Sequence, residues 1–464
     1  MKKILADRTF YKRVLLVTFP IILQQLLTSS VQLADNLMVG TLGELAIGSV
    51  SVVNQMYFVV IIVTFGAMGG AGIFSAQYFG SKQFEQLKQT FRFKLLIAFL
   101  LSSIAILIFT LFGEFFISLF TDNPITIAWG VDYLNIAKWV MIPMTLSSAI
   151  STTFREIGIT KPLLKISVIA ILSNVLLNYL LIFGHLGFPR LGIEGAAIAT
   201  LVSRSIEFAL LFVLLVWKGQ IFNTHIFELF KINSLLLKLI IITAIPLVIN
   251  EFLFSFGQTM FMQSYATRGD NALAAINITN TISQLVFITF GGIGTAVAVF
   301  IGNTLGENKL AEAKENSKKI IVFALAFAFI LGILLFVLSF FVLNLYDISI
   351  DTKNIARFNI RVNAFVIPVI SLYMVLYFTL RSGGDTRSTM LMDSGYIWVV
   401  QVPTVVLLSR LTDLRVIYLF LIIQLLEIPK VALAYSRYKK DYWVKNLALE
   451  NNKNAEKLMT KQAN

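Results

Sequence analysis

Two long stretches of this chain contain no charged residue. No Asp, Glu, Lys or Arg occurs in the 37 residues between Glu44 and Lys82 or in the 36 residues between Asp270 and Glu307. A helix of about 20 apolar residues already crosses the hydrocarbon core of a bilayer. Of the 464 residues, 57% are hydrophobic and 14% are charged, whereas about 25% of the residues of soluble proteins are charged. The sequence therefore predicts an all-α membrane protein and excludes a soluble fold.

Apolar segments predict twelve transmembrane helices. They lie at about residues 14–38, 46–78, 94–119, 132–154, 162–184, 194–217, 237–262, 271–303, 319–345, 358–380, 389–409 and 413–436. In the alternating loops, 30 Lys and Arg residues fall on the side of both termini and 8 fall on the other side. Because loops rich in basic residues stay in the cytoplasm, both termini are predicted to be cytoplasmic. The net charge of +13 is then mostly a topology signal, and no nucleic-acid partner is expected.

The two halves of the chain repeat each other at a constant offset. Matched pairs are Pro20 and Pro246, Arg155 and Arg381, Gly158 and Gly384, and Thr160 and Thr386. An offset of six spans gives both copies the same orientation in the membrane, which is the parallel class of transporter repeat. The predicted fold is two pseudo-symmetric six-helix bundles in a parallel 6+6 repeat. In each repeated turn the glycine permits a tight bend, and the arginine is expected to anchor lipid phosphates, with a gating contact as the alternative.

This organisation divides the chain into five parts. They are a cytoplasmic N-terminus at 1–13, an N-lobe at 14–217, a cytoplasmic linker at 218–236, a C-lobe at 237–436 and a basic cytoplasmic tail at 437–464. The chain has no cysteine and its two histidines are His185 and His225, so a thiol nucleophile is excluded and a histidine metal cage is not expected. Without a catalytic cluster or a Walker loop, the protein is expected to be neither an enzyme nor driven by ATP.

Four polar side chains in the first half form the main candidate site. Asp35 ends a run of 21 uncharged residues, Asn174 and Asn178 lie one turn apart on the fifth span, and Thr200 lies about 10 residues into the sixth span. Oxygen ligands suit a hard cation, so Asp35 and Asn178 are candidate Na⁺ ligands, whereas a desolvated Asp35 could carry a proton instead. The structural alternative is that Asp35 marks a helix end and the asparagines join helices.

Other acidic residues in the spans give weaker signals. Glu251 lies near the middle of the seventh span, where the first half has Gln25, and is a second candidate acidic site or a hydrogen-bonding contact between helices. Asp393 is six residues from Arg387 and is expected at the membrane interface. Two further acids are expected to form intrahelical ion pairs, Glu207 with Arg204 and Glu427 with Lys430.

Several segments in a fixed order resemble the MATE (multidrug and toxic compound extrusion) family. They are Asp35-Asn36-Leu37-Met38-Val39-Gly40, Leu42-Gly43, Asn174 and Asn178 with Tyr179, Gly195-Ala196-Ala197-Ile198-Ala199-Thr200, and Leu380-Arg381-Ser382-Gly383-Gly384-Asp385-Thr386. The resemblance covers about residues 10–440. It implies two six-helix lobes that export cationic drugs against an inward flow of Na⁺ or H⁺.

The resemblance also implies roles for individual residues. Asp35 matches the family's coupling carboxylate, Asn174 and Asn178 match polar groups of the fifth span, and Thr200 matches a threonine of the sixth. Some members carry Asp where this chain has Asn178, and several carry a glutamate that matches Glu251. Members with a C-lobe Na⁺ site have an aspartate on the tenth span, but residues 362–380 contain no acid. The N-lobe is therefore the expected coupling site.

The sequence thus predicts a secondary active multidrug efflux antiporter. Its expected partners are cationic amphiphilic small molecules and membrane lipids, it needs no cofactor beyond the coupling ion, H⁺ or Na⁺, and it is expected to be a monomer in a bacterial inner membrane. The alternative is a lipid-linked oligosaccharide flippase, which would need a basic central cavity for pyrophosphate. A channel or a passive membrane protein is a further alternative.

Overall fold

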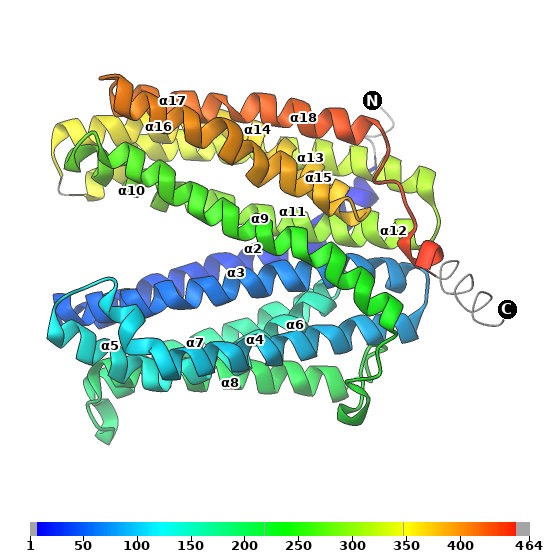
Figure 1. Cartoon of the computed structure of the whole chain (residues 1–464), viewed down its shortest axis with the longest axis horizontal. Coiled ribbons are helices and arrows are strands. Elements are labelled where there is room, and N and C mark those ends of the chain that lie inside the picture. Colours follow the sequence, from blue (N-terminus) through cyan, green and yellow to red (C-terminus); the bar gives the residue numbers. More distant parts are fainter. Residues whose placement is uncertain (1–6, 218, 347, 452–464) are drawn as a thin grey trace. The chain divides into compact units, whose positions relative to one another are not determined.

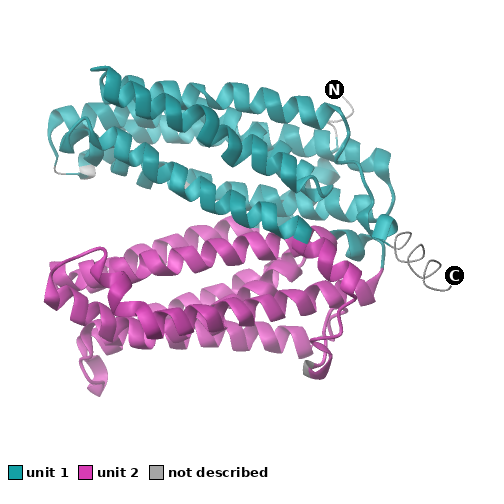
Figure 2. Ribbon diagram, viewed as in Figure 1, with its two compact units in different colours: residues 1–19, 76–82, 242–464 teal, residues 20–75, 83–241 magenta. Residues whose placement is uncertain are grey.

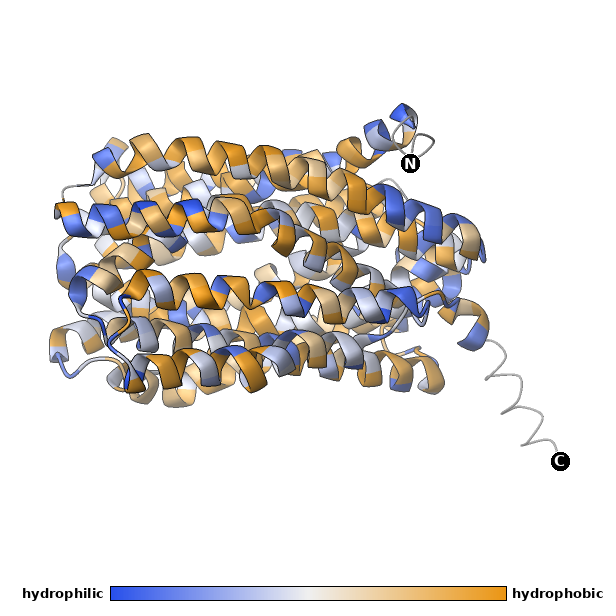
Figure 3. Cartoon of the chain, turned by 90° about the horizontal axis from the view of Figure 1, so that it is seen from above, coloured by the Kyte–Doolittle hydropathy of each residue, from blue (hydrophilic) through white to orange (hydrophobic). Residues whose placement is uncertain are grey.

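The computed structural model describes residues 7–217, 219–346 and 348–451, and the described residues are helical almost throughout, with no β-strand among them. Figure 1 shows the helices and Figure 3 their hydropathy, with apolar residues along most of each helix and hydrophilic residues gathered toward helix ends. Eleven of the helical segments are long and apolar enough to cross a membrane. The predicted all-α membrane fold is confirmed.

The helices of the first half are α2 (Arg8–Gly40), α3 (Glu44–Gly80), α4 (Phe84–Ser118), α5 (Pro124–Ala137), α6 (Met141–Glu156), α7 (Lys161–Phe183) and α8 (Gly192–Trp217). Those of the second half are α9 (Ser234–Ala266), α10 (Asp270–Phe287), α11 (Thr289–Val297), α12 (Asn303–Gly306), α13 (Leu310–Phe341), α14 (Ile350–Ser382), α15 (Thr386–Met390), α16 (Val402–Leu411), α17 (Val416–Leu425) and α18 (Glu427–Lys439). Short π-helical turns at Ala298–Gly302, Leu391–Gly395 and Ile397–Gln401 continue α11 and α15.

The fourth predicted span, at 132–154, is not one continuous α-helix. A 3₁₀ turn at Lys138–Val140 separates α5 from α6, so neither piece alone has the length of a spanning helix. Pro143 lies in the first turn of the second piece and has no N–H to donate to the turn before it, which favours the interruption. Together α5 and α6 form the fourth span in sequence order, which is added to the eleven above.

The chain divides into two compact units, coloured separately in Figure 2. Unit 1 comprises Met1–Phe19, Ala76–Lys82 and Ile242–Asn464, and unit 2 comprises Pro20–Ser75 and Gln83–Ile241. The first turns of α2 therefore belong to unit 1, and the division falls at a proline, which cannot donate the backbone hydrogen bond of a regular helix. The lobe boundaries predicted from the sequence stay predictions.

Contacts within unit 1 explain where the start of α2 packs. Phe10 is 2% exposed and its ring lies 5.3 Å from that of Phe300. The Nζ atom of Lys319 donates to an Asp7 carboxylate oxygen at 2.9 Å. These contacts fix the first turns of α2 against α13 and the π-helical turn at Ala298–Gly302, in the half of the chain that is synthesised last.

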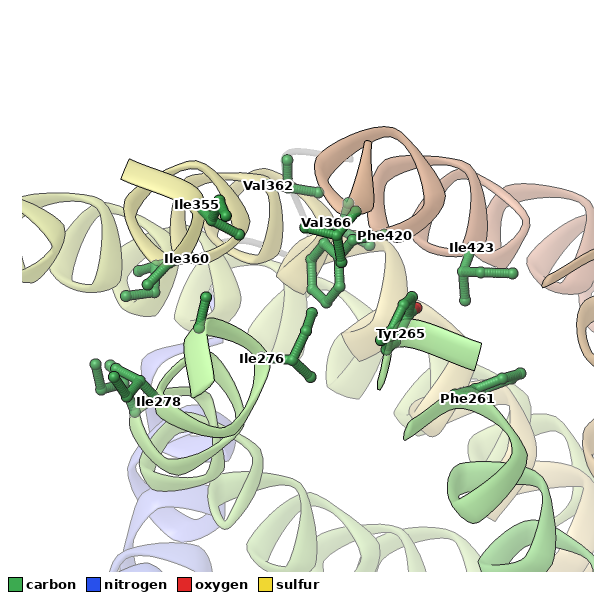
Figure 4. Packing of buried hydrophobic residues seen from close by; sticks show 14 of the residues in the cluster. Phe261, Tyr265, Ile276, Ile278, Ile355, Ile360, Val362, Val366, Phe420 and Ile423 are labelled. Carbon is green, nitrogen blue, oxygen red and sulfur yellow. The ribbon is translucent and has the colours of Figure 1, made fainter. Parts of the chain in front are cut away.

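Each unit has its own apolar core. In unit 1 the largest cluster joins α9, α10, α14 and α17, and Figure 4 shows its side chains from close by. Residues labelled there include Phe261, Tyr265, Ile276, Ile360 and Phe420. Large apolar side chains are also exposed, for example Phe99 at 58% and Leu111 at 63%, as a lipid-facing surface requires.

The last turns of α3 cross α12 within unit 1 without space for a side chain. A Cβ atom at Gly80 would overlap the backbone oxygen of Asn303, and one at Gly306 would overlap that of Gln77. Gln77 matches Asn303 and Gly80 matches Gly306 at the same offset that relates the repeated prolines and arginines of the two halves. The crossing is therefore built from equivalent positions of the repeat.

A segment after α18 covers this crossing, and we call residues 440–451 the C-terminal strap. The amide of Gln77 donates to the backbone oxygens of Ser382 at 2.8 Å and Lys445 at 3.3 Å, and its Oε1 accepts from the Leu447 N–H at 2.7 Å. Trp443 of the strap is 0% exposed. The strap thus binds a residue that lies far from it in the sequence.

Candidate cation-binding site

Three helices of unit 2 bring the sequence-predicted site residues together. Asp35 lies on α2, Asn174 and Asn178 lie one turn apart on α7, and Thr200 lies on α8. The two asparagines are 6% and 1% exposed, whereas Asp35 is partly exposed. An apolar helix keeps such polar groups only if they find partners inside the unit.

Hydrogen bonds join Asp35 to both asparagines and onward to α8. Asn178 Nδ2 donates to Asp35 Oδ1 at 2.5 Å and is 3.3 Å from Asn174 Oδ1. Asn174 Nδ2 lies 3.4 Å from the Ser203 hydroxyl, and in the alternative amide orientation Asn174 donates to both Asp35 oxygens, at 2.9 and 3.2 Å. Asp35 is therefore the centre of the cluster, and the asparagines join α7 to α2 and to α8, as the structural alternative also expects.

One oxygen of this cluster has no partner. The carbonyl oxygen of Asn178 is buried and accepts no hydrogen bond from the described residues. A buried carbonyl without a donor is unfavourable, and a bound cation or water can satisfy it. Asp35, Asn178 and the neighbouring Asn174 thus offer oxygen atoms of the kind that a hard cation prefers.

A cavity of about 50 Å³ opens beside Asp35. Its lining residues are Thr28, Val31, Gln32, Asp35, Ser167, Ala170, Ile171, Asn174, Thr200, Ser203, Arg204 and Glu207. This volume suits a small ion or a few water molecules, but not a drug. Among the described residues no three Asp, Glu, His or Cys side chains gather, so a cation here would be held by one carboxylate with amide and hydroxyl oxygens.

The cavity includes charged residues whose role the sequence did not indicate. Arg204 and Glu207 form the predicted intrahelical ion pair, with Nη1 and Oε2 2.7 Å apart, and this prediction is confirmed. Both side chains also line the cavity that contains Asp35. The signal in the sequence was the spacing of Thr200, Ser203 and Glu207, which places them on one face of α8.

A second polar cluster lies in unit 1 around Asp393. Asp393, predicted at the membrane interface, is 7% exposed and pairs with Lys430 at 2.8 Å. Asn250 donates to its other oxygen at 3.0 Å, and the Lys430 ammonium lies 4.3 Å from the Tyr373 ring centre. Its position at the membrane interface, expected from the nearby Arg387, stays a prediction, whereas its partners lie on other helices, where sequence spacing cannot find them.

Two further expectations concern this second cluster. Lys430 is 3.7 Å from Glu427, so the predicted intrahelical pair is confirmed, and Lys430 is shared with Asp393. Glu251 lies on α9 next to Asn250 and is partly buried. It is thus outside the Asp35 cluster, and its part in coupling stays a prediction.

The repeated arginine turns differ from what was expected of them. Gly158 and Gly384 have φ values of 83° and 85°, which confirms the tight bends. Arg155, however, donates to Gln24 Oε1 at 3.0 Å inside unit 2, and Arg381 is only 7% exposed. These side chains are engaged within their units and are not free to anchor lipid phosphates.

The sequence matches a known family twice. A sequence model of the MatE family matches residues 20–180 and again residues 246–407, and the two matches begin at the repeated prolines, Pro20 and Pro246. The chain belongs to the MatE family. It is therefore a multi-pass membrane protein built from two copies of one six-span unit.

Relatives and solved structures agree with this assignment. The chain is 27% identical over 401 residues to the probable multidrug resistance protein YoeA of Bacillus subtilis (strain 168), covering 86% of this chain and 87% of the relative. It is 26% identical to a probable multidrug resistance protein NorM of Bradyrhizobium diazoefficiens, with 88% of each chain covered. An outward-facing multidrug resistance MATE family transporter of the MOP superfamily has the same fold, with TM-score 0.84, 16% identity and coverage of 93% and 95%.

Proposed function

We propose that this protein is a secondary active multidrug efflux antiporter that exports cationic amphiphilic small molecules in exchange for inward H⁺ or Na⁺. Membership of the MatE family and relatives named as multidrug resistance proteins support the transport of drugs. The proposal includes no catalytic reaction and no cofactor other than the coupling ion. It places a monomer in a bacterial inner membrane, in contact with lipids and with both termini in the cytoplasm.

The Asp35 cluster is the observation that carries the coupling mechanism. A carboxylate within an apolar span costs at least about 2.5 kcal/mol, so it is retained for a function or is neutralised. Here it borders a cavity of ionic size and touches Asn178, whose carbonyl oxygen is unpartnered. A proton on Asp35, or Na⁺ held by Asp35, Asn174, Asn178 and Thr200, would neutralise the charge.

Exchange follows if the ion and the drug favour different states of the transporter. Each ligand must then weaken the binding of the other by the same factor, because coupling free energies are reciprocal. Ion binding from outside releases the drug there, and loss of the ion to the cytoplasm restores affinity for the drug. The flippase alternative is not favoured, since the relatives are named as multidrug resistance proteins.

The Asp35→Asn variant tests this proposal. It keeps the size of the side chain but removes the charge, so ethidium efflux from cells is expected to fall to the level of cells without the protein. The matched control is Asp132→Asn, which alters an exposed aspartate of the same unit outside the cavity and should leave efflux unchanged. If Asp35→Asn is expressed normally and exports ethidium at the rate of the unmodified protein, the coupling role is wrong.

Proteoliposomes identify the ion. Purified protein is reconstituted, and uptake of ethidium is measured with a Na⁺ gradient at constant pH and then with a pH gradient without Na⁺. The gradient that drives uptake names the coupling ion, and both should fail in Asp35→Asn. Uptake that follows neither gradient would overturn the antiport proposal.

A further inference from the structure

We infer that Arg204 is a tethered cation that replaces the coupling ion at Asp35 whenever the ion leaves, and returns to Glu207 when the ion binds. The inference rests on the proposed function, because it assigns a partner to the same carboxylate. It adds a positioning residue to the site and explains why an arginine lies in a cavity meant for cations.

The charges around the cavity are unbalanced until an ion enters. Asp35 and Glu207 are both acidic, and Arg204 is the basic residue that lines the cavity with them. Within the cavity lining one guanidinium is therefore shared between two carboxylates, and the charge of Arg155, which lies outside the lining, also acts on Glu207. A single proton or Na⁺ restores one positive charge for each negative charge, and the loss of that ion leaves one carboxylate bare in a poorly solvated place.

Glu207 is the fixed member of the pair. Its side chain is 12% exposed, and the Ser167 hydroxyl lies 3.5 Å from Oε1. Ser167 in turn accepts a hydrogen bond from Gln24 at 2.6 Å, and Arg155 donates to Gln24 at 3.0 Å. This chain of contacts holds Glu207 in place, so a change of partner requires Arg204 to move.

Arg204 has the freedom to move. Its side chain is 36% exposed, and within the part of the chain that the structure describes its guanidinium contacts a carboxylate only through Nη1. Thr200, one turn before it on α8, lines the same cavity as Asp35. Arg204 and Asp35 line the same cavity, so the change of partner that we infer is a rotation of the long arginine side chain within it.

The consequence is competition between the arginine and the ion. When Arg204 approaches Asp35 it weakens the binding of H⁺ or Na⁺ and assists release. When the ion binds, it displaces the guanidinium to Glu207, the arrangement that the structure contains. An ordinary intrahelical pair between residues three apart would stabilise α8 and have no effect on ion affinity.

Two single variants separate these explanations because they act in opposite directions. In Arg204→Gln the competitor is gone, so the ion should bind Asp35 more tightly. In Glu207→Gln the arginine loses its second partner and stays near Asp35, so the ion should bind more weakly. Glutamine at 207 keeps an oxygen for Ser167, and the double variant should behave as Arg204→Gln, because no tethered cation remains.

The measurement is displacement of bound ethidium from purified protein, followed by fluorescence anisotropy. Ethidium is titrated off with NaCl at constant pH, and separately with protons in choline buffer, to obtain the half-displacing concentration of each ion. Coupling between sites typically changes affinity between about 5- and 150-fold. We therefore expect the half-displacing ion concentration to fall about tenfold in Arg204→Gln and to rise about tenfold in Glu207→Gln. Arg204→Lys keeps the charge and should lie close to the unmodified protein.

Arg437→Gln is the matched control. Arg437 pairs with Asp385 at 2.7 Å and is 33% exposed, as against 2.7 Å and 36% for Arg204, but it lies in unit 1. The inference is overturned if the half-displacing concentration shifts in the same direction in Arg204→Gln and Glu207→Gln, or does not shift in either. The proposed function survives that outcome as long as Asp35→Asn abolishes displacement. If Asp35→Asn leaves displacement unchanged, the proposed function itself fails.

Discussion

Lys94 has a completely buried side chain, and it shows how single residues of unit 2 are stabilised. Its ammonium pairs with Glu156 at 2.5 Å and lies 3.2 Å from the Thr153 hydroxyl. The Glu156 carboxylate lies against Gly72, where a Cβ atom would overlap it. The two charges are 62 residues apart in sequence, so no local pattern could have paired them.

Removal of one charge of this pair should be strongly destabilising. Lys94→Met removes the buried ammonium that pairs with Glu156, and the loss of one partner of a buried pair typically costs about 3–5 kcal/mol. The double variant Lys94→Met with Glu156→Leu should recover much of that loss. Thermal unfolding of purified protein in detergent, followed by tryptophan fluorescence, measures both.

The control is Lys314→Met, because Lys314 and Asp441 form a solvent-exposed pair, 42% and 49% accessible. Exposed pairs contribute about 0–1 kcal/mol, so the unfolding temperature should barely change. Equal losses in Lys94→Met and Lys314→Met would contradict the argument from burial.

Individual residues also show which parts of the site could be predicted from the sequence and which could not. The sequence predicted Asp35, Asn174 and Asn178 because polar residues are conspicuous in an uncharged segment. The two asparagines are four residues apart, so they lie on one face of α7. The place of Arg204 and Glu207 in the cavity was missed, because their pairing with each other already explained them, although the spacing of Thr200 and Glu207 puts both on one face of α8. The pairing of Asp393 was not predictable for a related reason, since its partners Asn250 and Lys430 lie on other helices.

At the scale of elements, the crossing of α3 and α12 depends on two glycines. Hydropathy predicted spans at 46–78 and 271–303 but neither α12 itself nor its contact with α3, because an apolar pattern does not show which helix faces which. Gly80 and Gly306 occupy equivalent positions of the repeat, and this match becomes meaningful only once the backbones are seen to touch. The break between α5 and α6 was likewise hidden in a continuous apolar run.

Addition of one methyl group at either crossing glycine should therefore weaken the protein. Gly80→Ala and Gly306→Ala each force the helices apart, and overpacking of this kind costs about 1–3 kcal/mol. Gly291→Ala is the control, because no atom lies within 4 Å of the added Cβ. It should be neutral or stabilise α11 by about 0.5–1 kcal/mol. Thermal unfolding measures all three, and an unchanged Gly80→Ala would argue against the close crossing.

At the scale of the whole chain, the duplication was the most informative feature of the sequence. The repeat offset predicted two equivalent halves, and the family match at residues 20–180 and 246–407 confirms it. Which unit takes the start of α2 was not predictable, because Phe10 and Asp7 contact residues in the other half of the chain. Such long-range contacts do not change the hydrophobic periodicity of an apolar helix, so the sequence does not reveal them.

The duplication also gives a prediction for membrane topology. Both halves should enter with the same orientation, so the termini and the linker at 218–236 lie on one side. Green fluorescent protein fused after Thr224 or at the C-terminus should fluoresce in the cytoplasm, and alkaline phosphatase fused after Phe188 should be active outside. Active phosphatase after Thr224 would contradict the parallel repeat and the orientation drawn from basic residues.

The C-terminal strap has a consequence for biogenesis. Gln77 enters the membrane early, yet Lys445 and Leu447, which satisfy its amide, follow 368 and 370 residues later. At about 5–20 residues per second, a ribosome needs roughly 20 to 70 s to deliver them. During that interval the end of α3 lacks its contacts with the C-terminal strap. A polypeptide that ends before Trp443 never forms these contacts. Completion of translation thereby becomes a condition of a closed unit 1.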